Sequence, residues 1–161
     1  MKTSKVKLDY MPSVNFQIAG VSSAEMDYKL AYWLVRGFGV DFYMLPDIEV
    51  EREQRQTMSL FDSSLPSEPS RYSVYGNAID SVRRSDLLLI SNRHNGIYLL
   101  DEFHNFDYLF IVRDYSSFGL EKVMSALRSI GCISGAYILP LENIKSKKSI
   151  YDLWDSLQNR Q

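Results

Sequence analysis

The chain contains 161 residues, of which 45% are hydrophobic, 13% aromatic and 24% charged, with 8 glycines and 5 prolines. This composition excludes disordered, collagen-like and low-complexity proteins, and the length is enough to bury one ordinary hydrophobic core. Eighteen Lys and Arg residues against 20 Asp and Glu residues give a net charge of −2, which excludes a strong overall attraction to nucleic acid or to an anionic membrane.

The amino-terminal third predicts two strands and a helix. Apolar and polar residues alternate over 5–10 and again over 14–18, which indicates strands with one solvated face each. Ser22 and Glu25 have the spacing of a capping box, whose side chains satisfy free amide groups at the start of a helix. Apolar residues then recur at helical spacing, so we expect a helix over 23–36.

The central part predicts strands that are interrupted by a loop. A strand is expected over 40–45, and the alternating acids after Pro46 favour a strand with a charged outer face, with a short helix as the alternative. A short strand is expected over 58–61. The Ser- and Pro-rich residues 62–70 predict a mobile loop, and alternation over 71–79 predicts the next strand.

A hairpin is the most specific local feature of the sequence. The apolar run over 86–91 predicts a strand. Asn95 and Gly96 follow it, and both residue types tolerate the positive φ that a two-residue hairpin turn requires. We therefore expect a hairpin with its second strand over 96–100.

The carboxyl-terminal third predicts two strands and two helices. The strands are expected over 106–113 and 132–139, a helix between a Ser cap at 116–117 and Gly131, and a last helix around 150–157. If the two strands are parallel, their crossover should be right-handed. The complete set predicts an α+β fold, a single domain over 1–161, with a largely antiparallel, meandering sheet and two or three helices packed on one face.

Few residues are suited to metal binding or covalent catalysis. The two histidines, His94 and His104, and the one cysteine, Cys132, exclude the usual structural zinc sites and an internal disulfide. Glu102, His104 and Asp107 form a candidate ligand-binding or catalytic group, with a polar strand edge as the alternative. Cys132 beside a histidine is a candidate nucleophile, with a buried thiol as the alternative. We expect no cofactor and no metal.

The sequence favours a cytoplasmic location. Residues 1–7 contain no apolar run of signal-peptide length, and no run in the chain approaches 18 apolar residues. A chain without an internal disulfide also fits a reducing compartment. We therefore expect a cytoplasmic protein that does not span a membrane.

RNA contact is suggested by small basic clusters and by strand aromatics. The basic residues are Arg83, Arg84, Lys145, Lys147 and Lys148. A stacking platform for single-stranded RNA is suggested by four tyrosines on predicted strands, Tyr72, Tyr75, Tyr98 and Tyr108. The alternative is that these tyrosines belong to the core or to cross-strand pairs.

Protein contact is favoured by the aromatic content. Eleven tyrosines and eight phenylalanines are more than a core of this size usually absorbs, so some should be exposed where another protein binds. An exposed strand edge or the last helix is also expected to pair two copies of the chain as a homodimer.

Residues 16–30 read FQIAGVSSAEMDYKL, and residues 100–108 read LDEFHNFDY. These two segments resemble the IPExxxVDY family of Bacteroidota, and the Glu, Asp and Tyr of its motif fall on Glu102, Asp107 and Tyr108. The resemblance implies no activity, because none is assigned to the family. Its genes often lie near a ribonuclease III gene, which implies an accessory or RNA-linked role.

Three positions depart from the family motif. Leu100 stands in place of Ile, Asp101 in place of Pro and Phe106 in place of Val. The first and the third changes are conservative for a buried strand, whereas Asp101 lacks the fixed φ of proline.

The motif residues also predict a polar network. Asp27 and Tyr28 lie at the start of the first expected helix, and Glu102, Asp107 and Tyr108 lie around the motif strand. These five residues either fix the helix on the sheet or form a binding site. Asp27 also suits the dipole of the first helical turn.

The leading hypothesis is a non-enzymatic cytosolic accessory or adaptor domain that acts through protein–protein contacts. The first alternative is an RNA-associated factor linked to RNA processing. The second is a small-ligand-binding domain or enzyme around Glu102, His104 and Asp107.

Overall fold

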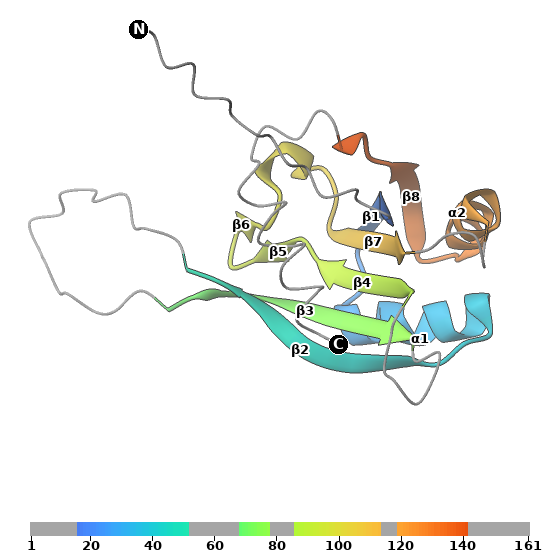
Figure 1. Ribbon diagram of the computed structural model, residues 1–161, viewed down its shortest axis with the longest axis horizontal. Helices are drawn as coiled ribbons and strands as arrows, with labels where there is room; N and C mark the ends of the chain where they lie inside the picture. Colours follow the sequence, from blue (N-terminus) through green and yellow to red (C-terminus); the bar gives the residue numbers. More distant parts are fainter. Residues whose placement is uncertain (1–15, 52–67, 78–85, 114–118, 142–161) are drawn as a thin grey trace, which may run out of the picture.

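The computed structural model describes residues 16–51, 68–77, 86–113 and 119–141 (Figure 1). Its elements in chain order are β1 (Phe16–Ser23), α1 (Asp27–Phe38), β2 (Phe42–Val50), β3 (Ser70–Asn77), β4 (Leu87–Ser91), β5 (Arg93–His94), β6 (Ile97–Tyr98), the 3-10 helix η1 (Asp101–Phe103), β7 (Tyr108–Arg113), α2 (Leu120–Ser129) and β8 (Ile133–Ile138).

Several predictions fall outside the described residues. These are the strands over 5–10 and 58–61, most of the loop over 62–70, the Ser cap at 116–117, the last helix around 150–157, and the basic residues Arg83, Arg84, Lys145, Lys147 and Lys148. Ser70, the last residue of the predicted loop, already belongs to β3.

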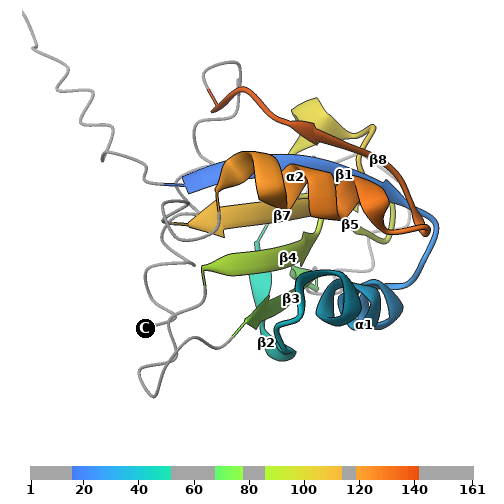
Figure 2. The ribbon, with the colours of Figure 1, turned by 90° about the vertical axis from the view of Figure 1, so that its right-hand side faces the viewer.

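A six-stranded antiparallel sheet forms the centre of the fold. Its strand order is β2-β3-β4-β7-β1-β8, and β5 and β6 form a separate two-stranded ribbon. Both helices cover the same face of the large sheet, as Figure 2 shows. The prediction of an α+β fold with a largely antiparallel sheet and helices on one face is therefore confirmed.

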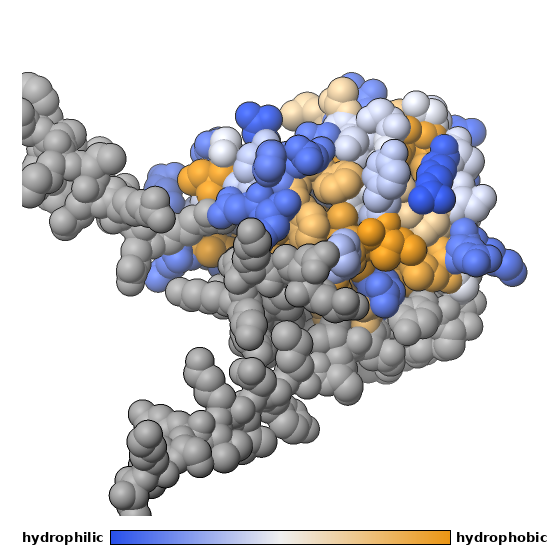
Figure 3. All heavy atoms as spheres, turned by 90° about the horizontal axis from the view of Figure 1, so that it is seen from above, coloured by the Kyte–Doolittle hydropathy of each residue, from blue (hydrophilic) through white to orange (hydrophobic). Residues whose placement is uncertain are grey.

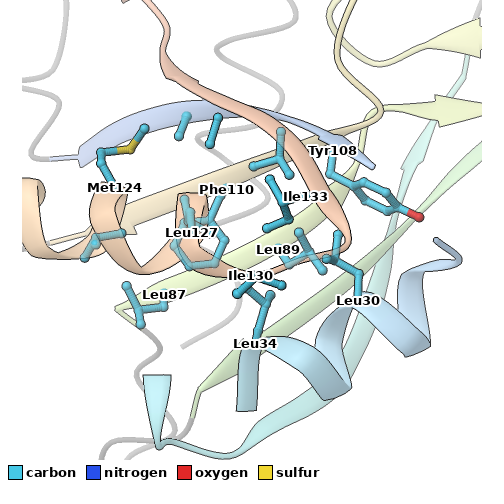
Figure 4. Packing of buried hydrophobic residues seen from close by; sticks show 14 of the residues in the cluster. Leu30, Leu34, Leu87, Leu89, Tyr108, Phe110, Met124, Leu127, Ile130 and Ile133 are labelled. Atoms are coloured by element: carbon cyan, nitrogen blue, oxygen red, sulfur yellow. The ribbon is translucent and has the colours of Figure 1, made fainter. Parts of the chain in front are cut away.

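Apolar side chains fill both faces of this sheet. On the helix-covered face, Leu30 of α1 and Leu127 of α2 pack with Phe110 of β7 (Figure 4). On the opposite face, Ile111 of β7 packs with a second cluster that includes Leu100, just before η1. Because β4 and β7 are buried on both faces, their sequences are continuous apolar runs without alternation.

The strand β1 lies between two segments from the carboxyl-terminal half of the chain. It pairs antiparallel with β7 on one side and with β8 on the other. β7 and β8 are therefore parallel to each other, and α2 connects them. The predicted strand-helix-strand unit does form, but β1 separates its two strands.

The start of α1 differs from the prediction. Ser22 and Ser23 were expected to open a helix, yet they end β1, where they pair with Gly135 and Ile133 of β8. Within the described chain, the residue before the helix, Met26, makes no side-chain cap. The capping-box prediction is therefore wrong, because pairing with β8 satisfies backbone groups that a helix would otherwise use.

The end of α1 agrees with the turn chemistry of the sequence. Gly39 adopts φ of 67° and donates its N–H to the carbonyl of Val35. This left-handed residue stops the helix without the steric cost that a side chain would add.

The Asn95-Gly96 turn forms as predicted, but it joins β5 to β6, whereas β4, the strand expected to enter the hairpin, pairs with β3 and β7 in the large sheet. Asn95 and Gly96 adopt φ of 48° and 79°, which matches the two-residue turn. The second strand covers only Ile97–Tyr98, because Leu99 and Leu100 turn away into the core ahead of η1.

The open question at Pro46 is resolved in favour of a strand. β2 continues through Pro46 to Val50, and its register against β3 shifts between Leu45 and Ile48. Proline is tolerated here because β2 is an edge strand. At the register shift Pro46 has no paired residue on β3, so the N–H that proline lacks is not needed for a hydrogen bond to that strand.

Candidate functional site

The candidate site lies where the start of β7 meets the connection between β1 and α1. Asp107 accepts a hydrogen bond from the Ser23 N–H at Oδ2 over 3.0 Å. The Tyr108 hydroxyl donates to the Glu25 carbonyl over 2.5 Å. The antiparallel pairing of Val21 with Tyr108 places these groups side by side. The two segments that carry the family resemblance are thus in direct contact.

Asn92 organises the other half of this region and was not singled out from the sequence. Its side chain is fully buried, and Nδ2 donates to the carbonyls of Phe103 and Phe106, each over 3.0 Å. Its Oδ1 accepts the N–H of Leu100 over 3.0 Å, and its backbone N–H donates to the Asp107 carbonyl over 2.9 Å. A single side chain therefore holds η1 and the approach to β7 in place.

The local electrostatics keep Tyr108 protonated. Burial raises the pKa of its hydroxyl to about 12, and the carboxylates of Asp27, Asp107 and Glu25 act in the same direction. Burial, followed by Asp27 and Asp47, also raises the pKa of Tyr75. A phenol with so high a pKa is a stable hydrogen-bond donor at neutral pH and a poor proton donor to a substrate.

Tyr108→Phe tests the hydrogen bond to Glu25 and gives a pH signature. We expect the free energy of unfolding to fall by about 1 kcal/mol at neutral pH, because the Glu25 carbonyl loses its donor. The folded-state pKa of about 12 exceeds the ordinary value of 10.0, so the stabilisation by Tyr108 is complete below pH 10.0. It is lost as the pH rises towards about 12, since the unfolded chain releases its proton first.

Urea unfolding across this pH range measures the effect. The wild type should lose more stability than Tyr108→Phe between the two pKa values. The exposed Tyr28→Phe should behave like the wild type. Equal pH slopes for the wild type and Tyr108→Phe would contradict the assignment.

The five residues of the predicted network do not all meet. Asp27 lies in the first turn of α1, where its Oδ1 accepts the Tyr28 N–H over 2.8 Å, and its charge acts on Tyr108. The ring of Tyr28 is exposed on the outer side of α1. Glu102 is half-buried on η1. Asp107 and Tyr108 bond directly to the β1–α1 connection.

The second candidate group, Glu102, His104 and Asp107, has divergent local contacts. The Asp107 carboxylate bonds to Ser23, whereas His104 Nδ1 lies 3.2 Å from the Asp101 carbonyl and its ring packs against Tyr98. In the described ranges, no group of three or more His, Cys, Asp or Glu residues is placed to hold a metal ion.

Cys132, the candidate nucleophile, packs against the helix-side core. It is half-buried, and its carbonyl accepts the Ser23 hydroxyl over 2.8 Å. His94, a candidate base, lies on β5 with its ring against Tyr72.

The predicted tyrosine platform for RNA is wrong. Tyr72 and Tyr108 are buried, and they belong to the clusters on opposite faces of the sheet. Tyr75 packs on the helix-covered face, whereas Tyr98 lies on β6 beneath the guanidinium of Arg93. Two buried rings on opposite faces cannot stack on successive bases of one strand.

Large apolar side chains are exposed on separate parts of the surface. On and just before α1 they are Met26, Tyr28, Tyr32 and Trp33, on β2 Tyr43 and Met44, on β6 Ile97, and on β8 Tyr137 and Ile138. Viewed from the β8 side, apolar residues gather in the middle of the surface and hydrophilic residues lie towards both ends (Figure 3). The aromatic excess in the sequence predicted such exposure but not its location.

No helix in the described ranges is long and apolar enough to cross a membrane. Comparison with known proteins found no family model, no curated protein and no solved structure that matches this chain.

Proposed function

We propose that this protein is a non-enzymatic cytosolic accessory or adaptor domain that acts through protein–protein contacts as a homodimer, and that it is related to the IPExxxVDY family. The observation that carries the proposal is the exposure of large apolar side chains on two separate surfaces, the outer side of α1 and the edge strand β8. An adaptor needs two contact surfaces, and amphipathic aromatic residues are enriched in such surfaces.

The contacts of the motif residues support a role without chemistry. Asp107 and Tyr108 bond to backbone groups of the β1–α1 connection, and Asn92 bonds to the chain around η1. These hydrogen bonds join the side chains to the backbone of the fold. We propose that the motif stabilises the domain and that the exposed surfaces perform its function.

The edge strand β8 supports a site for a partner strand. Its inner side pairs with β1, while the Ala136 carbonyl points outward and accepts a hydrogen bond from Arg128 Nε over 3.1 Å. The next two residues, Tyr137 and Ile138, are exposed, and their side chains project to opposite faces of the sheet. An added strand would displace Arg128 from the Ala136 carbonyl, pair with the outer backbone groups of β8 and contact both side chains.

The test is a pull-down of the tagged full-length protein from its own cells at native level, with and without nuclease. We expect a stoichiometric partner that survives nuclease and that Tyr137→Ser/Ile138→Ser reduces at least about tenfold, the loss typical of two central contact residues. Far-UV circular dichroism confirms that each variant is folded.

A matched control comes from Tyr43→Ser/Ile97→Ser. Tyr137 and Ile138 are 60% and 45% exposed, and Tyr43 and Ile97 are 53% and 39% exposed, so the same residue types are removed elsewhere. Recovery that collapses with nuclease would favour the RNA-associated alternative. Recovery of the protein alone would contradict the adaptor role and favour the ligand-binding or enzymatic alternative.

A further inference from the structure

The outer side of α1 carries an exposed strip of aromatic and basic residues. We define the α1 strip as Tyr28, Lys29, Tyr32, Trp33 and Arg36, which lie opposite the buried helix face. The rings of Tyr32 and Trp33 meet edge to face, 5.6 Å apart. Arg36 lies over the Tyr32 ring and donates to its hydroxyl over 3.0 Å.

The α1 strip is positively charged although the chain is negative overall. Lys29 and Arg36 are its charged residues, and the chain has a net charge of −2. Within the described residues, no ion pair joins Lys29 or Arg36 to a carboxylate, and Arg36 instead contacts the ring and hydroxyl of Tyr32. Tyr, Trp and Arg are also the residue types that contribute most to protein interfaces. A surface that covers this strip therefore needs apolar and acidic groups.

β2 carries such a surface on the same side of the sheet. Ile48 and Val50 point into the cluster on the face without helices, so the alternating residues Asp47, Glu49 and Glu51 point to the helix side. We define these three as the β2 acidic stretch. Met44, which is 70% exposed, precedes them on the side where Phe42 joins the helix-side core.

We propose that the α1 strip of one copy of this chain binds the β2 acidic stretch and Met44 of a second copy. α1 and β2 are neighbours at one edge of the fold (Figures 1 and 2). A two-fold axis beside them would place each strip on the acidic stretch of the other copy, so both halves of the contact form and the assembly closes as a dimer. Pro46 and the register shift hinder strand pairing along β2, which leaves side chains to make the contact.

Charge reversal tests this arrangement. Lys29→Glu/Arg36→Glu and Asp47→Lys/Glu51→Lys each place like charges across both halves of the contact. Glu49 is left unchanged because it forms an ion pair with Arg71 over 3.3 Å. In sedimentation equilibrium of the full chain, we expect the wild type to be a dimer and each variant to have a dimer dissociation constant at least about tenfold higher.

An equimolar mixture of the two variants gives the decisive result. In the mixed dimer both halves again join opposite charges, so the variants should form a heterodimer of near wild-type affinity. The control Arg93→Glu/Lys122→Glu makes the same change in net charge as Lys29→Glu/Arg36→Glu, but on other exposed surfaces, and should stay dimeric. A monomeric wild type, dimeric charge-reversed variants or a mixture that does not recover would each overturn the proposal.

This inference rests on the homodimer in the proposed function, and the two can fail separately. If sedimentation shows a monomer while the pull-down recovers a partner that depends on β8, the adaptor role holds and the self-contact is wrong. If the wild type is a dimer that the mixed variants restore but no other protein is recovered, the self-contact holds and the adaptor role is wrong.

Discussion

Asn92→Leu is expected to lower the free energy of unfolding by about 3 to 6 kcal/mol, because three buried backbone groups lose their partner. Leucine has a similar volume but leaves the carbonyls of Phe103 and Phe106 and the Leu100 N–H without the side-chain partners they now have. Each buried polar group that loses its partner costs about 1 to 3 kcal/mol. Burial prevents water from replacing the side chain.

Urea unfolding monitored by circular dichroism measures this loss. Asn92→Asp keeps an acceptor for Leu100 but removes both donors and brings a charge into the core, so we expect it to be at least as destabilising. Asn105→Leu removes an exposed amide from the same region and should change the stability by less than about 0.5 kcal/mol. Near wild-type stability of Asn92→Leu would refute the role assigned to Asn92.

Gly20→Ala is the second substitution with a large expected effect. A Cβ at Gly20 would lie 2.5 Å from two ring carbons of Phe106, closer than van der Waals contact allows. Gly20 pairs with both β7 and β8 in the centre of β1, so the backbone cannot move away easily. We expect a loss of about 1 to 3 kcal/mol, as for other overpacked sites.

A double-mutant cycle identifies the cause. Phe106→Val removes the ring, so Gly20→Ala should cost much less in that background, with a coupling of about 1 to 2 kcal/mol. Gly131→Ala is the control, because a Cβ there meets nothing within 4 Å and should be tolerated. Equal costs of Gly20→Ala in both backgrounds would show that the ring contact is not the cause.

Local sequence patterns predicted the structure correctly where the backbone conformation depends on a few neighbouring residues. Asn95 and Gly96 encode a turn that needs positive φ, and Gly39 encodes a helix end for the same reason. Helical spacing also located α2, and the apolar run located β4. These features form the same local structure in any compatible fold.

The start of α1 shows where local signals fail. Ser22 and Glu25 have capping-box spacing, but β8, more than a hundred residues later, pairs with Ser22 and Ser23. Ser23 is then used differently, with its hydroxyl donating to Cys132 and accepting the Glu25 N–H over 3.2 Å. A pattern of four residues contains no information on a strand so distant in the chain.

In the candidate site, too, some residues could be identified from the sequence and others only from the tertiary structure. The resemblance drew attention to Asp107 and Tyr108, whereas no pattern marked Asn92, because its partners are backbone groups that become neighbours only when η1 folds beside β4. The sequence could not separate exposed from buried tyrosines either. Tyr28 and Tyr72 differ in exposure because one lies on the outer side of a helix and the other between packed layers.

The sequence by itself determined the α+β class, the largely antiparallel sheet and most of its local elements, because periodicity and turn residues act over a few positions. The tertiary structure decided the strand order, the burial of both sheet faces and the meeting of β1, β7 and β8. It also brought α1 and β2 together at one edge of the fold. These features depend on contacts between residues far apart in the chain, whose free energy arises only when the layers pack.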